Sequence, residues 1–125
     1  MKQKIVGIYE MGYMAIELVA REGTGGEYYT IPEHGHIPRI KLGMDHTQWR
    51  DVVDVLLHET LEFAIDTKNG RLRPTYDTTL GHDNFVFLLT HPQFSDMCAK
   101  VAEFITTALP DLAAVWKKWK KRSKS

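Results

Sequence analysis

The chain has 125 residues, 43% of them hydrophobic and 26% charged, which is ordinary for a soluble globular protein and enough for one domain with a real core. It shows neither a signal-peptide pattern nor an apolar run long enough to span a bilayer, so we expect a cytoplasmic protein without a transmembrane segment. The single cysteine, Cys98, excludes an internal disulfide, and its apolar helical surroundings predict a buried thiol.

The net charge of zero conceals an uneven distribution. Six basic residues follow one another closely at the C-terminus, namely Lys117, Lys118, Lys120, Lys121, Arg122 and Lys124. Because all acidic residues lie at or before Asp111, the body carries a formal charge of about −6 and the tail about +6. An acidic body argues against a nucleic-acid binder, and the tail alone could act as one.

Strands are expected in the first 43 residues. Segments rich in β-branched and aromatic residues predict them over 4–9, 13–20, 27–31 and 37–42. The pattern of 13–20 also fits a helix, but Gly12 before it and Gly23–Gly26 after it favour hairpins. We therefore expect a small, mostly antiparallel sheet at the N-terminus.

A long central helix should follow, capped by Asp45 or Thr47 and ending near Lys68. Its apolar residues form a broad stripe that should pack against the sheet, consisting of Trp49, Val52, Val53, Leu56, Leu57, Phe63 and Ala64. His58 and Glu62 fall on the opposite side, which Leu61 and Ile65 border.

The C-terminal part begins with an irregular connection over 69–83 and a buried strand over 84–89. Thr90 to Gln93 form a capping box for a second helix, which runs to about Ala108. Pro110 should end that helix or start a third one, from Asp111 to about Lys121. The expected fold is an α+β domain over 1–116, with a sheet packed by a central helix and two C-terminal helices, followed by a basic tail over 117–125.

The sharpest functional signal is the run His58-Glu59-Thr60-Leu61-Glu62 within the central helix. Residues four apart share a helical face, so His58 and Glu62 can reach one metal ion. The run resembles the His-Glu-x-x-His motif of the zincin metallopeptidases, and the strand-like Arg39–Leu42 before the helix is similar to their layout. The resemblance implies zinc as cofactor, His58 as a ligand and Glu59 as the general base acting on a protein or peptide substrate. Glu62 stands where that family has its second His.

A catalytic zinc needs a third protein ligand. His91 is the first candidate, because it follows the strand over 84–89 and begins a helix. His82, then His34 and His36, are the alternatives. The competing interpretation is that His58 and Glu62 form a polar i, i+4 pair on an exposed helix and bind no metal.

The tail, Trp116–Ser125, is the second distinctive feature. Trp116 and Trp119 share a helical face that lysines surround, a pattern that can bind nucleic acid, an anionic membrane or an acidic protein. Alternatively, the tryptophans close the core and the lysines favour the helix C-terminus. The sequence thus leaves two functions open: a zinc-dependent hydrolase, or a non-catalytic accessory protein of the phage or mobile-element type whose tail binds a macromolecular partner. The oligomeric state is not encoded in any recognisable pattern.

Overall fold

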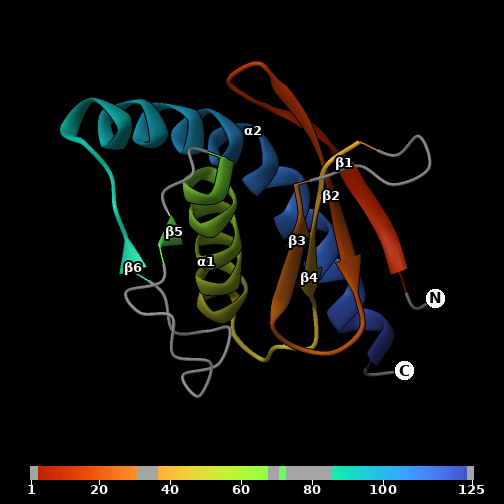
Figure 1. Cartoon of the computed structure of the whole chain (residues 1–125). Helices are drawn as coiled ribbons and strands as arrows, with labels where there is room; N and C mark the ends of the chain where they lie inside the picture. The colour runs from red at the N-terminus through yellow and green to blue at the C-terminus, as the bar shows by residue number, and fades with distance from the viewer. Residues whose placement is uncertain (1–2, 31–36, 68–70, 73–85, 124–125) are drawn as a thin grey trace.

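The computed structural model describes residues 3–30, 37–67, 71–72 and 86–123. A four-stranded sheet forms one layer, and two helices cover one of its faces (Figure 1). The α+β class and the sheet with a long C-terminal helix are therefore confirmed. Within the described residues, neither helix has an apolar stretch that could cross a membrane.

The sheet is built from the four segments that the sequence indicated. They are β1 (Gln3–Met11), β2 (Met14–Arg21), β3 (Gly26–Tyr29) and β4 (Arg39–Gly43). Their order is β1-β2-β4-β3, so β4 lies between two strands that precede it in the chain. β4 is parallel to β2 and antiparallel to β3, while β1 and β2 form an antiparallel hairpin. Two of the three pairings are antiparallel, as expected.

Glycines make the turn after β2 possible. Gly23 and Gly25 have φ angles of 88° and 70°, a left-handed conformation that side chains disfavour. Gly43 approaches this turn so closely that a Cβ atom there would collide with the Gly23 carbonyl. The glycine-rich turn expected over Gly23–Gly26 is present. It does not close the expected hairpin, because β4 lies between β2 and β3.

One face of the sheet carries the core, because alternate side chains of a strand point to the same side. The residues that face the helices lie in one buried cluster and include Tyr9, Met11, Ile16, Leu18, Ala20, Ile40 and Leu42. On β1, Ile5 and Ile8 are 57% and 60% exposed. They share the outer face because the register shifts between Ile5 and Gly7.

The central helix, α1 (Trp49–Thr67), packs its inner side against the sheet. Its buried residues are Val52, Leu56, Glu59, Thr60, Phe63, Ala64 and Ile65. The expected stripe was wrong at Leu57, which is 39% exposed, while Glu59 faces inward. Asp45 does not cap the helix, because its carboxylate accepts hydrogen bonds from the Gly23 amide and the Trp119 indole.

The C-terminal helix, α2 (His91–Ser123), begins with the expected capping box. The Thr90 amide donates to Gln93 Oε1 at 2.8 Å, and the Gln93 amide donates to Thr90 Oγ1 at 3.3 Å. The two helices expected here form one continuous helix that contains Pro110 and changes direction along its length (Figure 1). A proline removes one backbone hydrogen bond and bends a helix, and packing on both sides of it maintains the helix.

Two smaller predictions for this region need correction. Cys98 is exposed, because its neighbour Met97 occupies the position that faces the core. Of the strand expected over 84–89, residues 84 and 85 lie outside the described residues, Val86–Phe87 form β6, and residues 88 and 89 are not in a strand. β6 pairs with β5 (Arg71–Leu72). Leu88 after it is 65% exposed, whereas Leu89 is partly buried and packs against the core.

Candidate metal centre

Three side chains with metal-binding atoms, His58, Glu59 and Glu62, lie together on α1. One ligand atom from each lies within 4.8 Å of those of the other two. His58 Nε2 is 3.5 Å from Glu62 Oε2 and 3.9 Å from Glu59 Oε1. The helix thus brings two carboxylates to one imidazole nitrogen. His58 and Glu62 are four residues apart and Glu59 and Glu62 three apart, and both spacings make side chains neighbours on a helix.

The cluster extends from solvent into the interior. The side chain of His58 is 64% exposed, that of Glu62 is 23% exposed and that of Glu59 only 8%. Glu59, which the zincin resemblance casts as a base, is therefore also close enough to its neighbours to serve as a ligand. The sequence did not indicate this second role, because the apolar stripe alone did not place Glu59 on the inner face.

Strand β3 provides the space that Glu59 occupies. A Cβ atom at Gly26 would lie 2.8 Å from Glu59 Cγ and 3.0 Å from a methyl carbon of Val55. Such contacts are closer than side chains tolerate, so the glycine allows α1 to bring Glu59 against the edge strand. The same strand packs Tyr28 edge-on against Phe63, with ring centres 5.9 Å apart.

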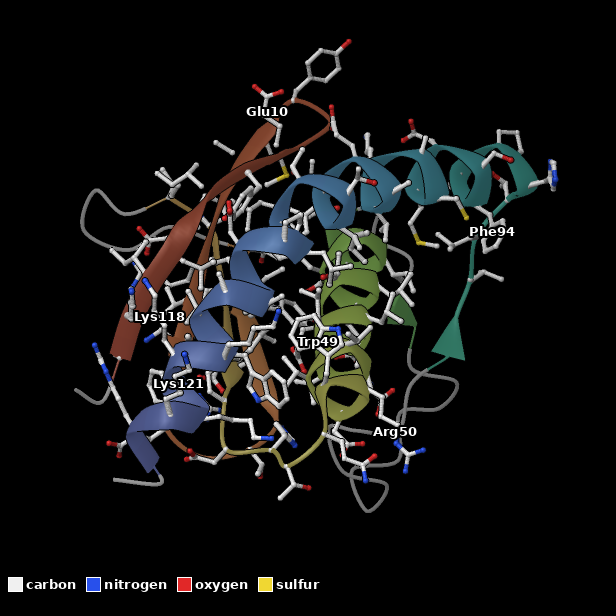
Figure 2. The ribbon with its side chains drawn as sticks, turned by 180° about the vertical axis from the view of Figure 1, so that it is seen from behind. Glu10, Trp49, Arg50, Phe94, Lys118 and Lys121 are labelled. Atoms are coloured by element: carbon white, nitrogen blue, oxygen red, sulfur yellow. The ribbon has the colours of Figure 1, made fainter. Side chains whose placement is uncertain are left out.

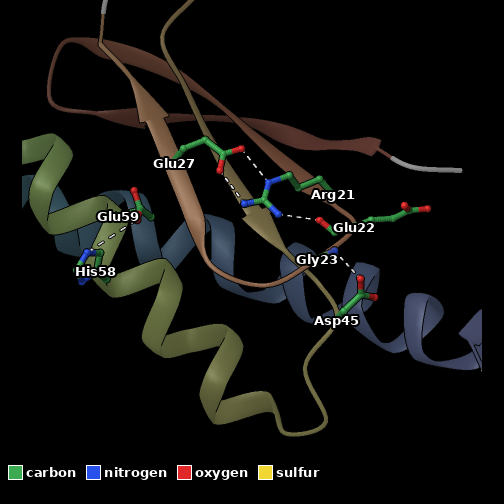
Figure 3. A network of polar contacts seen from close by, with 7 residues as sticks. All are labelled: Arg21, Glu22, Gly23, Glu27, Asp45, His58 and Glu59. Carbon is green, nitrogen blue, oxygen red and sulfur yellow. Dashed lines mark hydrogen bonds and ion pairs between the residues drawn. The ribbon is translucent and has the colours of Figure 1, made fainter.

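A bidentate ion pair joins Arg21 at the end of β2 to Glu27 of β3, the two strands that flank β4 in the sheet. Arg21 Nε and Nη2 donate to the two carboxylate oxygens of Glu27 at 2.8 and 2.7 Å (Figure 3). Arg21 Nη1 also donates to the Glu22 carbonyl at 2.7 Å. The guanidinium charge is thus directed to Glu27, and among the described residues the only ion pair of Glu59 is with His58.

Burial raises the pKa of the Glu59 carboxyl above its ordinary value. His58 acts in the opposite direction, Glu62 and Glu27 raise the pKa further, and Arg21 lowers it. The carboxyl therefore holds its proton more tightly than a free glutamate does, because its charged form lacks solvation. A cation placed beside Glu59 and Glu62 would stabilise that charged form.

The remaining predicted ligands are not part of this cluster. His91 is the exposed first residue of α2, and the group of candidate ligands in the described part of the chain does not include it. His34, His36 and His82 lie outside the described residues. The sequence predicted His91 as the third donor, with His82, His34 and His36 as alternatives, whereas the structure places the Glu59 carboxylate beside His58 and Glu62.

Two buried polar atoms were not anticipated. His46 Nε2 and Thr60 Oγ1 have no hydrogen-bond partner among the described residues. His46 lies between β4 and α1, and its carbonyl accepts a hydrogen bond from Trp116 Nε1 at 3.3 Å. No spacing or motif in the sequence distinguishes either residue from a solvated one.

A small apolar cavity lies at another place, between the β1–β2 turn and both helices. Its volume is about 150 Å³, and its lining includes Met11, Met14, Ala64 and Met97. None of its lining residues belongs to the His58 cluster.

The first turns of the basic tail continue α2 and contact the body. Trp116 is 8% exposed and packs against Trp49, with ring centres 5.5 Å apart. Trp119 Nε1 donates to Asp45 Oδ1 at 3.1 Å, and Lys120 Nζ donates to the Thr47 carbonyl at 3.1 Å. The tryptophans thus close the core at this end of the molecule.

Comparisons of the chain with protein-family models, with curated proteins and with solved structures found no match. The resemblance to the zincins therefore rests on the five residues from His58 to Glu62. The positions of His58, Glu59 and Glu62 in the fold carry the functional inference.

Proposed function

We propose that the protein binds a divalent metal ion, zinc first of all, through His58, Glu59 and Glu62. The observation that carries this proposal is the mutual approach of their ligand atoms to within 4.8 Å. Imidazole nitrogen and carboxylate oxygen are both common zinc ligands. Three protein ligands leave a coordination position for water, and the exposure of His58 gives water access to it.

The position of Glu59 supports a cation in particular. A buried carboxylate is unfavourable unless a positive charge or hydrogen-bond donors compensate for its lost hydration. His58 can supply that charge only when it is protonated, at a separation of 3.9 Å. A protonated His58 between two carboxylates is therefore the competing explanation of the cluster, and it predicts no metal at all.

We also propose hydrolysis as the chemistry of this site, on the basis of the zincin resemblance. A bound zinc ion supplies a Lewis acid that makes water a better nucleophile. Glu59 can hold a proton at its carboxylate, and its raised pKa brings it nearer to the range in which a base exchanges protons at neutral pH. A carboxylate bound directly to the metal is a poor base, so Glu59 serves as ligand or as base and not as both. With Glu59 as the base, His58 and Glu62 remain as ligands, and the third ligand of a catalytic zinc has to come from outside this cluster.

Metal binding is tested first on the full chain, purified without chelator. We expect near-stoichiometric zinc by mass spectrometry and zinc binding by titration calorimetry, both lost in a His58→Ala variant. A His91→Ala variant is the matched control, because it removes another exposed helical histidine outside the cluster. No metal in the wild type after zinc addition, or equal loss in both variants, would overturn the proposal.

A Glu59→Gln variant separates the two roles of Glu59. If Glu59 is the base, the variant keeps its zinc and loses hydrolysis of an unfolded protein substrate such as labelled casein. If Glu59 is a ligand, zinc affinity itself falls by more than the roughly 10- to 100-fold that the loss of a partner behind a ligand causes. Zinc binding by the wild type without hydrolysis of any peptide substrate would limit the function to metal binding.

A further inference from the structure

The last turns of α2 present a compact basic surface. Lys117, Lys118, Lys121 and Arg122 are exposed there. Lys118 and Lys121 lie on the C-terminal half of the helix, beside β1 and far from the start of α2 (Figure 2). Residues three and four apart on a helix are neighbours, so these cations form one continuous group. We call these four residues, together with Lys4, the basic end.

Lys4 belongs to the basic end because of how β1 runs along α2. The Gly12 amide donates to Glu103 and the Tyr9 hydroxyl donates to Asp111, so earlier residues of β1 lie beside later residues of α2. Lys4 is two positions before Val6, which packs against the core, so both are on the helix-facing side. The start of β1 and the end of α2 accordingly lie together (Figure 1).

This part of the helix is held rigidly on the body. Trp116 is inserted beside Trp49, and the Trp119 indole donates to Asp45. Lys120 lies 4.7 Å from the centre of the Trp116 ring and donates to the Thr47 carbonyl. The exposed lysines are therefore displayed from a fixed helix and not from a flexible arm.

The last turns of α2, which carry most of the basic end, contain no acidic residue. All acidic residues of the chain lie at or before Asp111. Asp111 itself accepts a hydrogen bond from Tyr9 at 2.7 Å, and Asp45 accepts from Trp119 and Gly23. These hydrogen bonds direct both carboxylates to donors within the fold, and the lysines of the basic end, Lys4, Lys117, Lys118 and Lys121, outnumber them.

We propose that the basic end binds the phosphate backbone of double-stranded nucleic acid, without reading its sequence. The charges of Lys117, Lys118, Lys121, Arg122 and Lys4 complement a line of phosphates. Neither indole is presented for stacking on unpaired bases: Trp116 is 8% exposed, and the partly buried Trp119 packs against the core and donates to Asp45. Contacts of this kind fix position and provide affinity but carry no base specificity.

An anionic membrane is a weaker match for this surface. Helices that bind membranes insert an apolar face between lipids. Here the apolar face of the segment, Leu112 and Trp116, is buried in the core. The exposed Ile5 and Ile8 of β1 lie on the outer face of the sheet, away from the helices. The segment can therefore attract an anionic membrane by its charge, but it has no exposed apolar face to insert between the lipids.

The salt dependence of binding gives the proposal a number. If about four phosphates are neutralised, the logarithm of the binding constant should fall with the logarithm of salt concentration with a slope of about −3.6. Affinity would then drop about 150-fold between 50 and 200 mM salt. We would measure this by fluorescence anisotropy of the 125-residue chain with a labelled 30-base-pair DNA duplex.

Paired variants locate the interaction. Lys118→Gln/Lys121→Gln removes two charges from the basic end, and Lys41→Gln/Arg50→Gln removes two from elsewhere, so both proteins have the same net charge. We expect the slope to weaken by about 1.8 in the first variant and to stay unchanged in the second. A Lys118→Arg/Lys121→Arg variant should retain binding, which controls for damage to the fold.

Three results would overturn the proposal. They are no duplex binding at 50 mM salt, an equal loss of binding in the two charge-matched variants, or binding to vesicles containing phosphatidylserine without binding to the duplex. The last result would assign the surface to lipid. None of them bears on the zinc proposal, because the variants leave His58, Glu59 and Glu62 intact.

Discussion

Two helical segments place charged residues against the same sheet in opposite ways. On α1, Glu59 points into the protein, and its side chain is only 8% exposed. On the last turns of α2, the tryptophans point inward and Lys117, Lys118 and Lys121 point outward. An inward charge destabilises the fold unless something compensates for it, whereas an outward charge is almost neutral for stability. The buried Glu59 therefore needs a compensating partner, whereas the exposed lysines of α2 are available for binding but need no partner for stability.

The largest loss of stability is expected at Trp116, which holds the last turns of α2 against the body. Replacing Trp116 with alanine would remove a buried ring, its packing on Trp49 and its hydrogen bond to the His46 carbonyl. We expect the free energy of unfolding, measured with urea, to fall by about 3–5 kcal/mol. A fall of less than about 1 kcal/mol would mean that the end of α2 is not anchored and that the lysines belong to a loose tail.

The next effect concerns the room made for Glu59. In a Gly26→Ala variant the new methyl group would meet Glu59 Cγ at 2.8 Å and the Lys41 carbonyl at 3.0 Å. We expect a loss of about 1–3 kcal/mol in unfolding free energy, together with weaker zinc binding. The double variant Gly26→Ala/Glu59→Ala should recover part of the lost stability, because the shortened side chain no longer meets the methyl group. If the double variant instead lost the sum of the unfolding free energies lost by Gly26→Ala and Glu59→Ala, the contact between these two residues would be contradicted.

The residues at the borders of the inner face of α1 could not be predicted from the sequence. The capping box from Thr90 to Gln93 is local, and the structure contains both of its hydrogen bonds. The stripe of α1 was correct at Leu56 and Phe63 but wrong at Leu57. Helical periodicity defines a broad face, and only the partner surface decides the residues at its borders.

The part of the site that could not be predicted from the sequence, the burial of Glu59 beside β3, depends on strand pairings between distant segments. The insertion of β4 between β2 and β3 depends on contacts between distant segments, and it sets which strand forms the edge beside α1. That edge strand carries Gly26, whose missing side chain admits Glu59. The pairing of His58 with Glu62 follows from helical spacing alone and was accessible from the sequence.

A smaller effect of defined sign is expected from the charge of Glu59. Because burial raises its pKa in the folded protein, the folded state binds the proton more tightly than the unfolded state. Stability should therefore fall as pH rises through the interval from the ordinary glutamate pKa to the raised one. A Glu59→Gln variant should lack this decline and gain at most about 1 kcal/mol at neutral pH, because solvent at the exposed side of His58 screens the charge.

Zinc should reverse the sign of that difference. A ligand that binds only the folded state stabilises it, by about 2.7 kcal/mol at a concentration 100 times its Kd. With saturating zinc, the wild type should become more stable than Glu59→Gln if Glu59 is a ligand. Urea unfolding of both proteins from pH 4 to 8, with zinc and with chelator, tests this. Equal stability of the two proteins in chelator at every pH would show that Glu59 carries no penalty and needs no cation.

The smallest effect completes the comparison. Lys118→Gln/Lys121→Gln should change the free energy of unfolding by no more than about 0.5 kcal/mol, because both side chains are exposed and glutamine maintains the helix. The same variant should nevertheless weaken the salt dependence of duplex binding. Unchanged unfolding free energy together with weakened duplex binding would show that the two lysines contribute to binding and not to the stability of the fold. If this variant instead lost stability as Gly26→Ala does, the lysines would be part of the packing, and the contrast between an inward and an outward charge would no longer hold.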